Sequence, residues 1–163
     1  RWCIITPIEG NKKRNINMIK KMWKLMGSKV EIMTPERHDQ TMAITSHLPH
    51  LIAYNIVSTA ADIENVTKSD VIKYSASGFR DFTRIAASDP TMWRDVILSN
   101  KEALLEVISR FSEDLSLLQK AIRWDDGETL HKVFSKTKKI RNKIIDAGQD
   151  VNTPDFGRSK KSK

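Results

Sequence analysis

An apolar seam in the second half of the chain constrains the fold more than any other feature of the sequence. Six apolar residues follow one another at alternating spacings of four and three: Leu104, Ile108, Phe111, Leu115, Leu118 and Ile122. This period of about 3.5 residues is typical of a long helix with one buried face, so we predict a helix over most of 101–123. A turn at 125–127 and a second apolar series from Leu130 to Ile144 predict another helix. Helices joined by so short a turn pack antiparallel.

The first 34 residues predict one βαβ unit. Residues 2–6 form a short apolar run that Pro7 stops, as expected for a buried strand. Residues 11–26 have helical periodicity and end at Gly27, and residues 29–33 alternate as a second strand. Such a unit would not stand comfortably alone. The 163 residues contain no Gly-x-Gly-x-x-Gly fingerprint, so the sequence predicts no dinucleotide-binding loop here.

A long helix is predicted from Pro35 to about Ile63, with Thr34 as its cap. Pro49 lies within it and should kink it, because proline cannot donate the helical hydrogen bond. His47 and His50 are three residues apart and point in similar directions. Three interpretations of this pair stay open: histidines satisfied in the core, a metal pair, or contacts to a ligand. A metal site would need a third ligand at helical spacing, which the sequence lacks.

The segment 75–95 concentrates specific polar residues. We predict a helix that opens at Gly78, then a stop and a fresh N-cap at 88–90, where proline takes the first helical position. Arg80 and Arg84 are four apart and share one face of the first helix, so each can offer a planar fork to a carboxylate or phosphate. The alternative is a solvated helix with surface arginines.

Two stretches carry a family resemblance. Residues 78–86, Gly-Phe-Arg-Asp-Phe-Thr-Arg-Ile-Ala, are followed by 89–95, Asp-Pro-Thr-Met-Trp-Arg-Asp, and together they resemble the signature of the prephenate and arogenate dehydrogenases. Upstream, residues 45–50, Thr-Ser-His-Leu-Pro-His, resemble the family's Ser-His-Leu-Pro-His element. The similarity runs from about Trp2 to Ile145.

The resemblance implies a mainly α fold. Residues 1–34 would be the C-terminal end of an α/β nucleotide-binding domain, and 35–146 an all-helical substrate-binding and dimerisation domain. Residues 147–163 contain Gly, Pro, Ser and Lys without apolar periodicity, and we expect a disordered basic tail. The helical seam has two interpretations: an intramolecular hairpin, or the family's interlocked helical dimer, which offers a regular seam more partners.

The resemblance also implies roles for individual side chains. Arg84 matches the arginine that pairs with a substrate carboxylate, Ser46 and His50 match positions that contact the ligand, and Asp81 matches an acidic residue at the mouth of the site. Trp93 matches a tryptophan that reaches into the neighbouring subunit's site. The full set of predicted substrate-binding residues is Ser46, His47, His50, Arg80, Asp81 and Arg84. No catalytic residue and no metal site is expected within this chain.

The implied function is the NAD- or NADP-dependent oxidative decarboxylation of prephenate or arogenate in tyrosine biosynthesis, by a homodimer. The chain alone is expected to be inactive, because it carries neither the cofactor loop nor the histidine that in the family polarises the substrate hydroxyl. The alternative is a non-enzymatic helical dimerisation or interaction module. The sequence does not choose between the two substrates or the two cofactors.

Composition limits the remaining classes. A net charge of +8 is compatible with nucleic-acid binding, but the basic residues cluster near the C-terminus without interleaved aromatic residues, so we expect no nucleic-acid partner. No apolar run is long enough to span a membrane. The single cysteine, Cys3, and the lack of a recognisable signal peptide favour the cytoplasm. Because the chain begins at Arg1 and not at methionine, we expect a fragment or a processed piece.

Overall fold

The computed structural model describes residues 1–67 and 74–148, and it begins with the predicted βαβ unit. Strand β1 (Trp2–Ile5) pairs in parallel with β2 (Lys29–Ile32), and helix α1 (Lys13–Leu25) connects them. Gly27 ends α1 at φ 82°, where the Gly27 N–H donates to Lys24 and the Ser28 N–H to Trp23. These two bonds form a Schellman motif, which explains why glycine occupies this position.

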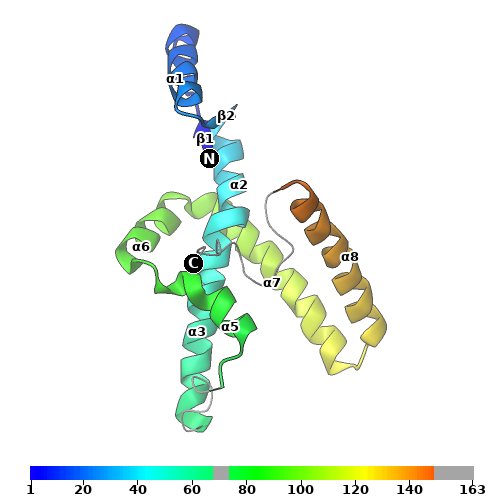
Figure 1. Ribbon diagram of the computed structural model, residues 1–163. Helices are drawn as coiled ribbons and strands as arrows, with labels where there is room; N and C mark the ends of the chain where they lie inside the picture. Colours follow the sequence, from blue (N-terminus) through cyan, green and yellow to red (C-terminus); the bar gives the residue numbers. More distant parts are fainter. Residues whose placement is uncertain (68–73, 149–163) are drawn as a thin grey trace, which may run out of the picture.

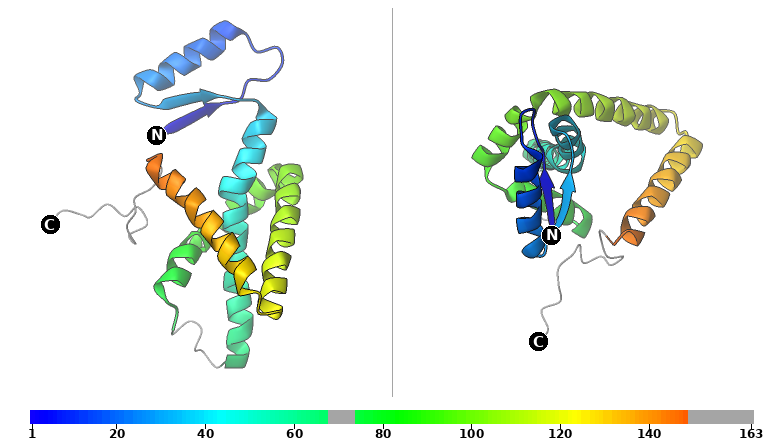
Figure 2. Two further views of the ribbon diagram at one scale, coloured as in Figure 1. Left: turned by 90° about the vertical axis from the view of Figure 1, so that its right-hand side faces the viewer. Right: turned by 90° about the horizontal axis from the view of Figure 1, so that it is seen from above.

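The βαβ unit lies beyond the N-terminal end of a central helical rod (Figures 1 and 2). None of its residues is fully buried, and the apolar residues of α1 remain largely open to solvent. That the unit would not stand comfortably alone stays a prediction, and the absence of a fully buried residue in it is in keeping with that prediction.

The rod consists of α2 (Pro35–Met42), the π-helical turn η1 (Ala43–His47) and α3 (Leu48–Thr67). The Thr34 hydroxyl caps α2 by accepting from the Arg37 N–H at 3.2 Å, as predicted. The helix is irregular where Pro49 predicted it: the Leu48 N–H donates to Ala43, five residues back. Since Pro49 has no N–H for the carbonyl four residues earlier, the turn before it widens to a π-turn.

The next segment begins with α5 (Ser77–Thr83) and the 3₁₀ turn η2 (Arg84–Ala87), followed by α6 (Pro90–Ser99). The predicted cap of α6 is confirmed, because the Asp89 carboxylate accepts from the Met92 N–H at 2.7 Å. Helix α5 ends at Thr83, and Arg84 opens the 3₁₀ turn η2 with φ −50° and ψ −37°, which are still α-helical values. Arg80 and Arg84 are thus separated by one turn of α5, in keeping with the prediction that they share one helical face.

Helices α7 (Lys101–Arg123) and α8 (Gly127–Asp146) form the predicted hairpin. Asp126 caps α8 by accepting from the Thr129 N–H at 2.9 Å. Figures 1 and 2 show α6 to the left of the rod and α5 in front of it, as seen in Figure 1. Helix α7 leads away to α8, which stands apart from the rod. No helix in the described part of the chain is both long and apolar enough to cross a membrane.

The core lies where η1 and α3 cross α6 and α7. Its buried apolar residues are Ala43, Leu48, Ala53, Trp93 and Leu104, and Ala121 is buried separately near the turn from α7 to α8. The seam of α7 is split between this core and solvent, since Leu104 is 2% exposed but Leu115 and Ile122 are 53% and 65% exposed. The tail predicted to be disordered falls, from residue 149 onward, outside the described residues.

Candidate functional site

Two polar residues, His47 and Asn100, are buried at the crossing of the rod with α6 and α7. His47 is the last residue of η1, and Asn100 separates α6 from α7. The Asn100 Nδ2 lies 2.8 Å from the Asp39 carbonyl oxygen and 3.1 Å from the His47 Nδ1. One amide nitrogen, with two hydrogens, therefore bridges α2 and η1.

The pKa of His47 lies below the usual value for histidine. Burial is the largest cause, because desolvation disfavours the charged imidazolium. The nearby His38 and His50 lower the pKa further, whereas the Asp39 carboxylate raises it by a smaller amount than burial lowers it. His47 is therefore predisposed to be neutral at physiological pH.

His50 makes a different kind of contact one turn later. Its Nδ1 lies 2.8 Å from the Ser46 backbone carbonyl oxygen, which can only accept, so Nδ1 carries a proton. The Nε2 of His50 is then the nitrogen left for a ligand. His50 and Ser46 are both partly exposed, as expected for residues that line an accessible site.

Trp93 covers both histidines from α6. Its indole stacks on the His50 ring with centroids 3.6 Å apart and planes 21° apart, and it meets His47 edge-on at 6.3 Å. Its Nε1–H is buried and has no acceptor among the described residues. A buried donor without a partner is costly, so a ligand or another subunit would be a natural source of the acceptor.

The structure thus brings together four predicted residues, Ser46, His47, His50 and Trp93. The predicted residues Arg80, Asp81 and Arg84 lie on α5 and η2, which pack against α3. Arg80 and Arg84 are exposed, and within the described ranges neither forms an ion pair or a side-chain hydrogen bond. Their guanidinium groups are available to an anion.

Sequence reasoning missed Asn100, Asp39 and Tyr54. The Tyr54 hydroxyl donates to the Ser88 carbonyl at 2.7 Å, which ties α3 to the corner between η2 and α6. Asn100 stands directly before the apolar seam, a position that suggests a helix cap, but its side chain makes no cap bond to α7. No local pattern signals its contact with His47.

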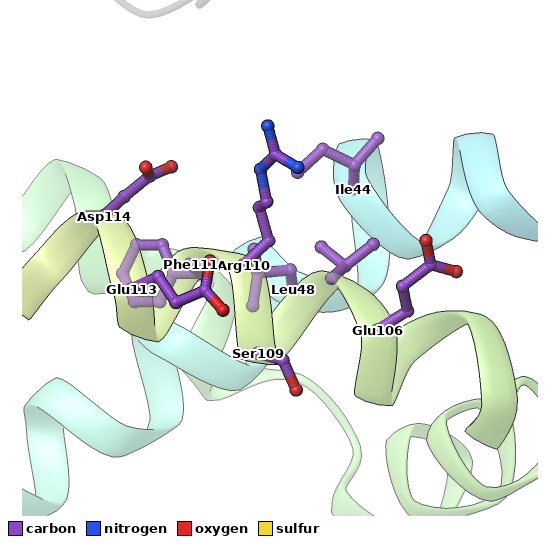
Figure 3. Close-up of a pocket in the computed structure, with 9 residues that line it drawn as sticks. Ile44, Leu48, Glu106, Ser109, Arg110, Phe111, Glu113 and Asp114 are labelled. Atoms are coloured by element: carbon purple, nitrogen blue, oxygen red, sulfur yellow. The ribbon is translucent and has the colours of Figure 1, made fainter.

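A separate groove of about 650 Å³ lies between the rod and α7. Figure 3 shows Arg110 of α7 extending beside Ile44 of η1, with Glu106 and Asp114 on either side along α7. None of the predicted site residues lines this groove. We therefore place the candidate site at the histidines and not here.

The described residues offer little to a metal ion or a dinucleotide. No group of three His, Cys, Asp or Glu side chains in the described ranges is placed to hold a metal. The segment from β1 to α1 contains Gly10 as its sole glycine, and the Lys12 cap position of α1 makes no side-chain cap bond. A phosphate cradle of the dinucleotide type is therefore not formed there.

The βαβ unit, the helical rod with its covered histidine pair and the helical hairpin together define a mainly helical protein with a small two-stranded parallel sheet at its N-terminal end. Residues 34–136 match the family model for the prephenate dehydrogenase dimerization domain. The chain belongs to this family, and the resemblance inferred from its motifs is confirmed.

Individual relatives agree with this assignment. The chain is 39% identical over 138 residues to the cyclohexadienyl dehydrogenase of Zymomonas mobilis, covering 85% of this chain and 47% of that protein. It is 32% identical over 141 residues to the prephenate dehydrogenase of Bacillus subtilis, covering 86% of this chain and 38% of that protein. The chain thus spans half or less of the length of these relatives.

A solved structure confirms the fold. The prephenate dehydrogenase of A. aeolicus, in complex with hydroxyphenyl propionate and NAD⁺, matches with a TM-score of 0.81 and 38% identity. The match covers 86% of this chain and 49% of that one. The predicted fold class, a βαβ end followed by a helical domain, is therefore correct.

Proposed function

We propose that the full-length product of the gene encoding this chain is a prephenate or arogenate dehydrogenase of tyrosine biosynthesis. The family membership and the names of the relatives support this assignment. The reaction would transfer a hydride from the ring carbon that bears the hydroxyl to the nicotinamide of NAD or NADP. The ring carboxylate would leave as carbon dioxide, and aromatisation of the ring would drive the reaction.

One observation carries the proposal: two motifs about 40 residues apart in sequence meet in space. The His47 and His50 rings of the first motif lie against Trp93 of the second, at centroid distances of 6.3 and 3.6 Å. Two helix surfaces with no common role would have no reason to bring both motifs together, so this contact supports a shared ligand site. If the histidines were only packing residues of the core, they would not need the second motif beside them.

Each side chain has a proposed part in binding the substrate. Arg84 pairs with a substrate carboxylate, because its guanidinium is exposed and unpaired in the described structure. Ser46 and His50 contact the ligand, and His47 presents a neutral ring. Arg80 adds positive potential and Asp81 lies at the mouth of the site. These groups bind and orient the substrate and do not themselves accept the hydride.

The cofactor would be held elsewhere in the full-length protein, because the residues of β1 and α1 do not form a phosphate cradle. We therefore propose that this chain by itself does not catalyse the reaction. The protein would act in the cytoplasm, without binding nucleic acid.

We also propose a homodimer formed through α7 and α8. The apolar residues that these helices leave exposed support a second copy as their partner, in keeping with a family model named for dimerization. Trp93 lies on its own chain's histidines here, and we propose that in the dimer it reaches the partner's site.

The test is calorimetric titration of prephenate into the full-length product in the presence of NAD, followed by an assay for NADH. The Arg84→Ala variant should bind prephenate at least about tenfold more weakly, because it loses a charge-assisted pair. Arg94→Ala is the matched control, since Arg94 is exposed on α6 and pairs with Asp95 at 2.8 Å. A folded dimer that binds neither prephenate nor arogenate would favour the interaction module instead.

A further inference from the structure

We propose that Asn100 is a positioning residue that holds His47 as a neutral ring protonated at Nε2, so that His47 donates to an acceptor atom of the substrate. The substrate contact rests on the proposed function. The effect of Asn100 on the ring does not, because it follows from the contacts within the chain.

The Asp39 carbonyl decides which way the Asn100 amide points. A carbonyl oxygen only accepts, and it lies 2.8 Å from the Asn100 Nδ2. If the amide were flipped, its oxygen would face the carbonyl oxygen and both would lack a proton. The Nδ2 must therefore be the atom at this position.

The orientation of the amide then decides the state of the His47 ring. The same Nδ2 lies 3.1 Å from the His47 Nδ1, and an amide nitrogen donates but does not accept. The His47 Nδ1 must therefore be the unprotonated acceptor, which leaves the proton on Nε2. A proton added to Nδ1 would set two donors against each other in a buried place, so Asn100 and burial both favour the neutral ring.

The neighbouring histidine is held in the opposite way. The Ser46 carbonyl fixes the proton of His50 on Nδ1, and its Nε2 is left open. The Nε2 of His50 can accept a hydrogen bond while Nδ1 keeps its bond to the Ser46 carbonyl, whereas His47 cannot be protonated at Nδ1 without losing the bond to Asn100. The two rings therefore present different chemistry: a neutral hydrogen-bond donor at His47, and at His50 a nitrogen able to accept a hydrogen bond.

This difference has a consequence for binding. A neutral N–H donor can bind a hydroxyl, carbonyl or carboxylate oxygen of the substrate. It orients that oxygen without adding a positive charge to the site. If His47 were the other tautomer, with its proton on Nδ1, its Nε2 would be an acceptor and would repel the lone pair of a substrate oxygen. Loss of Asn100 should therefore weaken substrate binding although Asn100 itself touches no substrate.

The direct test is nuclear magnetic resonance of the full-length product labelled with ¹⁵N-histidine, which distinguishes the two tautomers by the shifts of the ring nitrogens. The His47 signals are assigned by their loss in His47→Gln. We expect wild-type His47 to be protonated at Nε2. In Asn100→Asp the new carboxylate should accept from Nδ1 and move the proton there.

Binding is tested with a second variant that adds no charge. We expect Asn100→Ala to raise the KM for prephenate by about tenfold, as for the loss of one oriented hydrogen bond, with a smaller change in kcat. Asn55→Asp is the control for the charge change of Asn100→Asp, because Asn55 is exposed on α3. It should leave both the tautomer and the KM unchanged.

Two results would overturn the proposal: a wild-type His47 protonated at Nδ1, or a KM that does not change in Asn100→Ala. The first is measured on the wild type and so does not depend on whether a variant folds. If the wild type neither binds nor oxidises prephenate, the proposed function is wrong, and the tautomer measurement still decides whether Asn100 sets the ring.

Discussion

The hydroxyl of Tyr54 donates to the backbone carbonyl of Ser88 at 2.7 Å, across 34 residues of sequence. Ser88 connects the turn η2, which carries Arg84, to helix α6, which carries Trp93. A single side chain of α3 therefore fixes the position of both motif residues relative to the histidines on the rod.

Replacing Tyr54 by Phe should loosen this corner. We expect the free energy of unfolding to fall by about 1 kcal/mol, because one partly buried hydrogen bond is lost. Prephenate affinity should also fall, since Arg84 is held less firmly. Denaturant unfolding and calorimetry measure the two effects. Ser88→Ala is the control: it removes the Ser88 hydroxyl but keeps the carbonyl that Tyr54 uses, so equal losses of affinity in both variants would contradict the argument.

The burial of His47 predicts a pH-dependent stability. Because burial lowers the pKa of His47 in the folded state, the unfolded state binds the proton more readily. The contribution of His47 is fully present above about pH 6.5, the usual pKa of histidine, and is lost as the pH falls through the folded-state pKa. Denaturant midpoints measured from pH 7.5 to 5 should therefore decrease. His47→Gln should flatten this dependence, and His131→Gln on exposed α8 should retain it.

The unpaired Nε1–H of Trp93 predicts an effect on binding. Trp93→Phe keeps an aromatic face for His50 but removes the donor, so prephenate affinity should fall about three- to tenfold if a ligand or the partner subunit supplies the acceptor. Trp23→Phe on α1 serves as the control for a tryptophan removed elsewhere. Unchanged affinity in Trp93→Phe would mean that no such acceptor exists in the complex.

The exposed apolar residues of α7 and α8 predict a dimer interface that a single charged substitution should disrupt. Leu115 and Phe134 are 53% and 57% exposed, and Leu115→Asp or Phe134→Asp would place a carboxylate in the proposed apolar interface. We expect the dimer dissociation constant to rise by at least about 100-fold, measured by analytical ultracentrifugation. Leu25→Asp is the control, because Leu25 is even more exposed but lies on α1. A wild type that sediments as a monomer would contradict the proposed dimer.

Local signals account for what the sequence predicted well. The caps at Thr34 and Asp89, the stop at Gly27 and the turn before α8 each depend on residues within one turn of each other, so their chemistry is readable from the sequence. The period of the seam likewise placed α7 at its observed bounds. An irregularity at Pro49 was predicted for the same reason, as a kink, and the structure has it as the π-turn at 43–47.

The contacts that build the site are not local. Asn100 meets His47 across 53 residues, and Tyr54 meets Ser88 across 34, so neither pair leaves a periodic trace in the sequence. The 3₁₀ turn at Arg84 arises where the chain must end one helix and reach the cap of the next within a few residues. The family resemblance predicted the residues that bind the substrate, and the structure identified Asn100 and Tyr54 as residues that position them.

The π-turn at 43–47 lets the rod carry a proline inside the histidine motif without ending. Pro49 offers no N–H to the carbonyl four residues before it, so a regular α-helical turn cannot be completed at this point. The Leu48 N–H instead donates to the Ala43 carbonyl, five residues back, and the wider turn takes up one extra residue before α3 continues. His47, His50 and Tyr54 are therefore presented from one continuous element, and the proline costs the rod a hydrogen bond but not its continuity.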